Sequence, residues 1–347
     1  PPVGRHRTPL EPFPFHPLHA AMKIALLGVG AWGSALAKLL LAEGHQITAW
    51  DHDLANLRAV AASGRNEKYL PGVFLGAGLT PSEDPAAAWS GCDGVIVAVP
   101  SKGIRLVASA LAGFAGPVVS VTKGIEYETG LTMSAIVRAA APTARVAALS
   151  GPTLALEVAR GVPTAAVVAS ADEATAGFFQ RLFHRPTFRI YTSPDPLGVE
   201  LGGALKNVIA IAAGLNDGLG FGDNSKAALV TRGIAEIRRL GVACGARSET
   251  FSGLSGLGDL VVTCFSPLSR NRTLGEQLGR GARLEDLLAR AVSVAEGYPT
   301  ARAARALARR HEVPVPIIDE VYAVLYEAKP PAAAVRDLLA RVSKPED

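Results

Sequence analysis

Hydrophobic and polar positions follow two different patterns along the chain, and the change comes near residue 194. Before it, short uninterrupted apolar runs alternate with helical stretches, as expected of strands buried in a parallel sheet and of the helices that connect them. The predicted strands are 23–29, 46–50, 94–100, 117–122, 145–149, 164–169 and 188–191, and helices are predicted at 34–43, up to residue 111 and around residue 157.

After residue 194 the apolar positions recur with the period of an amphipathic helix, and strand signals are almost absent. Glycine-rich or polar segments at 218–222, 256–260 and 269–272 are interpreted as loops between helices. The chain is therefore expected to join an α/β part to an all-helical part. The predicted helices of the second part are 196–216, 225–240, 249–252, 274–279, 284–291, 300–310 and 317–326.

A glycine motif lies directly after the first predicted strand. The sequence Gly28-Val29-Gly30-Ala31-Trp32-Gly33 is followed by a helix and a second strand, which is the order of a dinucleotide-binding unit. Gly28 allows the tight turn, Gly30 lets the backbone approach a pyrophosphate, and Gly33 lets helix and strand pack closely. The unpaired N–H groups at the start of the helix would face the phosphates. A tight strand–helix turn without a ligand is the alternative.

The length of 347 residues also favours two domains. We expect an α/β, Rossmann-type N-terminal domain with a mostly parallel sheet at 22–204. An all-α substrate and dimerisation domain is expected at 205–347. Residues 1–21 are rich in Pro and His and lack hydrophobic periodicity, which predicts a flexible extension. Arg7 and His16 are interpreted there as solvated side chains rather than partner contacts.

Composition narrows the functional classes. Hydrophobic residues make up 49% and charged residues 19%, which is ordinary for a globular protein. Although the pI is about 9.1, arginines and acids are interspersed along the late helices, so no nucleic-acid-binding stripe is predicted. The three cysteines are far apart, so neither a disulfide framework nor a metal site is expected, and a reduced cytoplasmic location fits best. Neither an uninterrupted membrane-spanning run nor a signal peptide is evident.

Two lysines lie where functional groups are expected. Lys123 comes directly after a predicted strand, as do Gly151 and Thr153, and ligands of such sheets bind at the carboxyl ends of the strands. Lys206 lies early in an apolar helix at the join of the two domains. Burial there would lower its pKa, so that its amine could exchange a proton near neutral pH. The alternatives are solvated charge for Lys123 and, for Lys206, a packed stem with its amine in water.

In their order along the chain, these motifs resemble those of the bacterial-type NAD(P)-dependent glycerol-3-phosphate dehydrogenases. The resemblance extends from Met22 to about Lys329. The matching segments are 28–33, Val121-Thr122-Lys123-Gly124, Ser150-Gly151-Pro152-Thr153, Leu201-Gly202-Gly203-Ala204-Leu205-Lys206-Asn207-Val208-Ile209-Ala210, Gly256-Leu257-Gly258-Asp259-Leu260, Ser269-Arg270-Asn271-Arg272 and Glu296-Gly297-Tyr298.

The resemblance implies hydride transfer between a nicotinamide ring and C2 of dihydroxyacetone phosphate or sn-glycerol 3-phosphate, a precursor of glycerophospholipids. It implies Lys206 as proton donor and acceptor, assisted by Lys123 and Asp259, in a homodimer that uses NAD or NADP and no metal. The implied substrate site is Lys123, Gly151, Thr153, Lys206, Asp259, Ser269, Arg270 and Asn271. The implied cofactor site is Gly28, Gly30, Ala31, Trp32, Gly33, His52, Lys123, Ala155, Arg270, Val294 and Glu296.

The chemistry of these side chains agrees with that reaction. An ammonium group can stabilise the negative charge that develops on the carbonyl oxygen and donate its proton. A carboxylate such as Asp259 would raise the pKa of Lys206 and orient its amine. Arg270 offers a planar fork for a phosphate, and Asn271 an amide donor. A structural ion pair for Asp259 and a solvated face for Arg270 are the alternatives.

The choice between NAD and NADP depends on the end of the second predicted strand. Asp51 lies where a carboxylate accepts hydrogen bonds from the ribose hydroxyls of NAD and would repel the 2′-phosphate of NADP. Capping of the next helix is its alternative role, which Asp53 could fill equally well. His52, when protonated, and Arg58 could offset the phosphate charge. The balance favours NAD.

Two departures from the family pattern concern the cofactor. Ala31 stands where the family often has Ser or Asn, which removes one side-chain contact. The segment 50–53 also lacks the Arg that is common in relatives that prefer NADP. These departures leave the nucleotide preference open.

Two other functions are compatible with parts of the pattern. A related two-domain dehydrogenase of β-hydroxy acids or 6-phosphogluconate would also place a lysine near the domain junction. A non-catalytic nicotinamide-binding protein could retain the fold. The 269–271 segment and the Gly258-Asp259 pair argue against the first, and Lys123, Lys206 and Asp259 together argue against the second.

Overall fold

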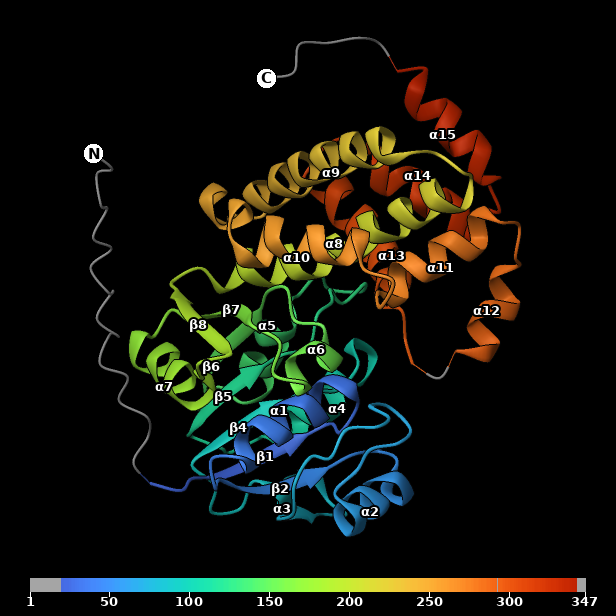
Figure 1. Cartoon of the computed structure of the whole chain (residues 1–347). Coiled ribbons are helices and arrows are strands. Elements are labelled where there is room, and N and C mark those ends of the chain that lie inside the picture. Colours follow the sequence, from blue (N-terminus) through green and yellow to red (C-terminus); the bar gives the residue numbers. More distant parts are fainter. Residues whose placement is uncertain (1–19, 292, 342–347) are drawn as a thin grey trace, which may run out of the picture.

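The computed structural model of the chain describes residues 20–291 and 293–341. It comprises an α/β part at the N-terminal side and a helical part at the C-terminal side, as the hydrophobic pattern predicts (Figure 1). The expectations for residues 1–19, including Arg7 and His16, lie outside the described residues.

The α/β part is built on one sheet of eight strands in the order β3-β2-β1-β4-β5-β6-β7-β8. All neighbouring pairs are parallel except β6 and β7. Because β1 lies between β2 and β4, the chain changes direction across the sheet there, which is where such folds bind ligands. The strands are β1 (Lys23–Leu27), β2 (Gln46–Trp50), β3 (Leu79–Pro81), β4 (Gly94–Val97), β5 (Pro117–Ser120), β6 (Arg145–Ser150), β7 (Thr164–Ala169) and β8 (Phe188–Ser193).

Helices cover both faces of this sheet. In β1, Ile24 and Leu26 pack in one core cluster with α1 and α7, whereas Ala25 and Leu27 pack in another with α4 and α5. Burial on both faces explains why this strand is apolar from Ile24 to Leu27. The helices of this part are α1 (Ala31–Leu41), α2 (Leu54–Ser63), α3 (Pro85–Ala88), η1 (Ser101–Gly103), α4 (Ile104–Ala110), α5 (Met133–Ala140), α6 (Ala155–Ala159) and α7 (Glu173–Phe183).

The helical part is organised around α8 (Pro196–Gly218), in which every residue from Gly198 to Asn216 is buried. By length and composition α8 is apolar enough to cross a membrane, but 94% of its most apolar stretch is buried inside the chain. It is a core helix. Around it lie α9 (Asp223–Ala243), η2 (Ser248–Ser252), η3 (Leu254–Gly258), α10 (Asp259–Phe265), α11 (Arg270–Gly279), α12 (Leu284–Arg290), α13 (Gly297–Arg310), α14 (Pro316–Tyr326) and α15 (Pro331–Leu339).

Two segments predicted as loops are helical. Residues 254–258 form a π-helical turn that runs directly into α10, and Gly256 is required there because a Cβ would lie 2.1 Å from the Phe251 carbonyl oxygen. The polar segment 269–272 starts α11, because the Ser269 hydroxyl accepts a hydrogen bond from the Arg272 N–H and caps the helix. The glycines of the first segment therefore reflect close packing, and the polar residues of the second reflect the start of a helix.

Several elements were not predicted from the sequence, namely β3, α3, α5, α7 and α15, whereas the helix expected after Asp53 is α2. The predicted domain boundary between residues 204 and 205 falls inside α8, so it divides a continuous helix. Where the two domains separate stays a prediction.

Candidate active site

Lys206 lies in the middle of α8, and its amine is buried. Its Nζ lies 2.9 Å from Oδ1 of Asp259 and donates to the Thr263 hydroxyl at 2.6 Å. Only 7% of the Lys206 side chain and 2% of the Asp259 side chain are exposed. The alternative of an amine reaching into water is therefore wrong.

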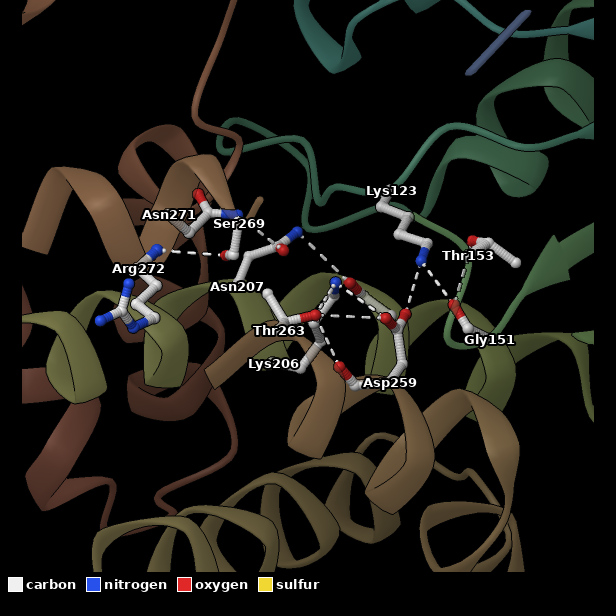
Figure 2. A network of polar contacts seen from close by, with 11 residues as sticks. Lys123, Gly151, Thr153, Lys206, Asn207, Asp259, Thr263, Ser269, Asn271 and Arg272 are labelled. Atoms are coloured by element: carbon white, nitrogen blue, oxygen red, sulfur yellow. Dashed lines mark hydrogen bonds and ion pairs between the residues drawn. The ribbon is translucent and has the colours of Figure 1, made fainter. Parts of the chain in front are cut away.

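Asp259 also binds the second lysine. Lys123 comes from the segment after β5, and its Nζ lies 2.5 Å from Oδ2 of Asp259 and donates to the Gly151 carbonyl oxygen at 3.0 Å. The Thr153 hydroxyl donates to the same carbonyl oxygen at 3.1 Å. Figure 2 shows this network, in which one carboxylate holds a lysine that follows β5 and a lysine of α8.

Small residues let these groups approach one another. A Cβ on Gly202 would lie 2.7 Å from the Ser255 carbonyl oxygen, and one on Gly203 would lie 2.3 Å from the Ser150 hydroxyl and 3.6 Å from Cδ of Lys123. The glycine pair that precedes Lys206 therefore lets the 255–259 turn and the end of β6 pack directly on α8. Asp259 in turn stands in the first turn of α10, where a carboxylate is favoured.

The electrostatics suit a proton-exchanging group. The pKa of Lys206 is lowered to about 8. Burial is the main cause, Asp259 opposes the shift, and the positive charge of Lys123 adds to it. An amine with this pKa is present in both protonation states near neutral pH. It can therefore donate a proton in one direction of a reaction and accept one in the other.

The start of α11 brings three predicted substrate residues together. Ser269 is buried as the helix cap, whereas Arg270 is exposed and lies near the carboxylate of Glu296. Asn271 donates to Oδ1 of Asn207 at 2.8 Å and accepts from the Gly297 N–H at 2.9 Å. Most of the Asn271 amide is thus used within the protein, which leaves one side-chain N–H for a ligand.

The glycine turn has the form expected for a dinucleotide. Gly28 has a φ of +108°, and a Cβ there would lie 2.6 Å from the Ala98 backbone carbon. A Cβ on Gly33 would lie 2.1 Å from the Gly28 carbonyl oxygen, so the helix packs tightly on the strand. At Gly30, by contrast, no protein atom lies within 4 Å of a Cβ position. This open space at the uncapped start of α1 fits a pyrophosphate.

Asp51 is engaged by the protein itself. Its two oxygens accept from the N–H groups of Val29 at 2.7 Å and Asp53 at 2.9 Å, and the side chain is buried. Asp53 rather than Asp51 caps α2, by accepting from the Asn56 N–H. His52 is exposed over 73% of its side chain, and its Nδ1 lies 3.0 Å from Asp51. Arg58 is paired with Glu83.

The other predicted cofactor residues lie in three places. Ala31, Trp32 and Ala155 are half-buried at the starts of α1 and α6, and Trp32 packs edge-on against Phe188. Val294 and Glu296 precede α13 in the helical part. Both carboxylate oxygens of Glu296 accept from Ser101, at 3.0 Å from its N–H and at 2.6 Å from its hydroxyl. Glu296 therefore joins the helical part to η1, which follows β4.

The sequence analysis missed four polar residues that support the site: Asn66, Ser101, Asn207 and Thr263. Asn207 and Thr263 had a detectable signal, because Asn207 follows the lysine and Thr263 lies one helical turn after Asp259. Asn66 and Ser101 lie in segments that carry no recognisable motif. Among residues 20–291 and 293–341, no three His, Cys, Asp or Glu side chains are grouped as a metal site.

Comparisons with known proteins agree on one family. Residues 23–176 match the model of the NAD-dependent glycerol-3-phosphate dehydrogenase N-terminus, and residues 195–336 match that of its C-terminus. The chain is 49% identical to glycerol-3-phosphate dehydrogenase [NAD(P)+] of Anaeromyxobacter dehalogenans, over 94% of this chain and 100% of that protein. It is also 49% identical to the Moorella thermoacetica enzyme of the same name, over 92% and 96%.

A crystal structure of glycerol-3-phosphate dehydrogenase from Coxiella burnetii has the same fold. The two structures superpose with a TM-score of 0.89 at 34% sequence identity, and the match covers 92% of this chain and 99% of that one. The similarity therefore includes both the α/β part and the helical part.

Proposed function

This chain belongs to the NAD-dependent glycerol-3-phosphate dehydrogenase family, and from that premise we propose how its residues perform the reaction. It is an NAD(P)-dependent oxidoreductase that interconverts dihydroxyacetone phosphate and sn-glycerol 3-phosphate. The observation that supports the assignment of roles is the buried Lys206 amine, held 2.9 Å from Asp259 and with a pKa lowered to about 8.

Lys206 is the proton donor and acceptor. When bound, the nicotinamide ring supplies or receives the hydride. In the reducing direction, the C2 carbonyl oxygen gains negative charge as the hydride reaches C2, and Lys206 donates a proton from Nζ to that oxygen. In the oxidising direction, the neutral amine accepts the hydroxyl proton. Asp259 and the Thr263 hydroxyl orient the amine toward one position.

Lys123 has a different role, since it lies on the opposite side of Asp259 and is held by the Gly151 carbonyl oxygen. Its positive charge lowers the pKa of Lys206 and stabilises the developing oxyanion. Asp259 compensates the charge of both lysines, so that the buried Lys206 and the half-buried Lys123 can lie close together. Gly151 and Thr153 complete this side of the substrate site.

The phosphate of the substrate binds at the start of α11. The free N–H groups of the first turn and the exposed Arg270 guanidinium are suited to a dianionic group. Ser269 fixes the helix start, and the remaining N–H of Asn271 adds a donor. The pyrophosphate of the cofactor binds over Gly30 at the start of α1.

The test measures oxidation of NADH and of NADPH by the purified chain, with dihydroxyacetone phosphate and, separately, with β-keto acids as the substrate. Reduction of NADP with 6-phosphogluconate is measured as well. Turnover restricted to dihydroxyacetone phosphate supports the proposal. Turnover of an acid substrate instead would favour the related two-domain dehydrogenases. Cofactor binding without any turnover would favour a nicotinamide-binding protein without catalysis.

The remaining parts of the proposal concern the whole chain. A dinucleotide-binding domain up to residue 204 and a substrate and dimerisation domain from residue 205 act in the cytoplasm as a homodimer. The exposed side chains of Leu257, Val261 and Phe265 recur every four residues on one face of η3 and α10, and this apolar face is a candidate for contact with a second copy. NAD is the expected cofactor.

A further inference from the structure

Asn66 is a buried amide at the glycine turn, although it lies in a loop far from it in sequence. The side chain is fully buried. Its Nδ2 donates to the Val29 carbonyl oxygen at 2.7 Å and to the Ser34 hydroxyl at 2.8 Å. Its Oδ1 accepts from the Tyr69 N–H at 3.2 Å and from Nδ2 of Asn56 at 3.4 Å.

The partners of Asn66 are at the centre of the proposed pyrophosphate site. Val29 is the residue between Gly28 and Gly30, and Ser34 belongs to the first turn of α1. Asp51 accepts from the Val29 N–H at 2.7 Å, so both polar backbone groups of Val29 are held by side chains from outside the turn. Asn66 and Asp51 thus fix the one non-glycine residue of the turn from two sides.

This arrangement has a physical purpose. The glycines on both sides of Val29 have many accessible backbone conformations, and fixing the turn costs conformational entropy. If the turn is already fixed before the cofactor binds, binding does not lose that conformational entropy, and the affinity is higher. An Asn is suited to this position because Nδ2 has two hydrogens for two acceptors, whereas Asp has no donor when ionised.

We propose that Asn66 is a positioning residue of the dinucleotide site, which holds Val29 and the first turn of α1 so that the N–H groups at the start of α1 point at the pyrophosphate. This inference rests on the proposed use of NAD or NADP. Since both nucleotides contain the same pyrophosphate, Asn66 affects the affinity of both equally. It acts through the turn and does not touch the substrate.

The experiment compares Asn66→Ala with Asn56→Ala, a matched control that removes an amide bonded to Asn66 but not to the turn. Dissociation constants of NADH, NADPH and ADP-ribose are measured by titration without substrate, together with the melting temperature of the free protein. Asn66→Ala should raise the dissociation constants of all three ligands roughly tenfold, because two acceptors at the turn lose their donor. Asn56→Ala should change the three dissociation constants less than twofold.

A second readout separates positioning from a general loss of structure. The KM for dihydroxyacetone phosphate at saturating NADH should be unchanged in Asn66→Ala. If that variant does not fold, Ser34→Ala can be used instead, because it removes the hydroxyl that accepts from Asn66. It should raise the dissociation constants of NADH and NADPH by a common factor of about 3.

Folded variants that bind all three ligands like the wild type would overturn the inference, as would a loss confined to one of the two nucleotides. A wild-type chain that binds neither NADH nor NADPH would instead refute the proposed function.

Discussion

Replacement of Lys206 by Met should remove catalysis and leave cofactor binding in place. Met has an unbranched chain of similar length, so it can occupy the buried path of the lysine stem. Asp259 would not become an unpaired buried charge, because Lys123 remains 2.5 Å from its other oxygen. The change therefore removes the amine with little disturbance of its surroundings.

The expected magnitude follows from the pKa of Lys206. At its ordinary value of 10.5, about 1 lysine in 3000 would be neutral at pH 7, whereas at about 8 the neutral fraction is about 1 in 11. Burial thus provides some 300-fold more of the neutral base needed for oxidation, while most of the amine stays protonated for reduction. Loss of general acid–base catalysis should lower kcat by roughly two to four orders of magnitude.

The assay is the pH dependence of kcat in both directions. In the wild type, oxidation of sn-glycerol 3-phosphate should rise with pH and level off near pH 8, and reduction of dihydroxyacetone phosphate should fall above it. Lys206→Met should lose both dependences, with the NADH dissociation constant changed less than twofold. Lys226→Met is the matched control, since Lys226 is also buried in the helical part but pairs with Asp217.

The control should lose stability and keep the pH dependence centred near 8. The reasoning is refuted if Lys206→Met retains near-normal kcat and the same pH dependence. In that case Lys123 becomes the candidate for the proton-exchanging group.

Three further predictions concern the phosphate, the nucleotide and the assembly. Arg270→Ala should lower kcat/KM for dihydroxyacetone phosphate roughly 10- to 100-fold but leave the weak activity on unphosphorylated dihydroxyacetone unchanged, and equal losses would assign Arg270 to the cofactor or the fold. The wild type should have a higher kcat/KM with NADH than with NADPH, and Asp51→Ser should reduce that ratio; an unmoved ratio would exclude Asp51 from the discrimination. The wild type should sediment as a dimer and Val261→Asp as a monomer, whereas dimers in both would place the interface elsewhere.

The sequence determined the class of the protein and the position of its central lysine. Apolar runs and their spacing reflect burial of strands and helices, which is a local property, so the sheet and the long helix around Lys206 could be predicted. The glycine turn was predictable for the same reason, because φ at Gly28 and packing at Gly33 depend on neighbours within one turn. Short elements such as β3 have too few residues to show a period.

Two segments were wrongly predicted as loops because their composition is typical of loops. Glycines at 253–258 suggest a loop by composition, but Gly256 is needed because a side chain there would clash with the Phe251 backbone, and Gly202 lets η3 pack closely on α8. Ser269 and its polar neighbours suggest a loop, although the same residue types are favoured at helix starts. Which interpretation applies depends on what packs against the segment.

Only the tertiary structure decided which side chains share a partner. Asp259 holds Lys123, 136 residues away, and Lys206, and this sharing rather than either lysine alone sets the electrostatics of the site. Asp51 stands where the sequence predicts a ribose contact, yet it also holds the Val29 N–H while Asn66 holds the carbonyl oxygen. Periodicity encodes which face of an element is buried, but hydrogen-bond partners are chosen when distant segments meet, so they could not be predicted from local pattern.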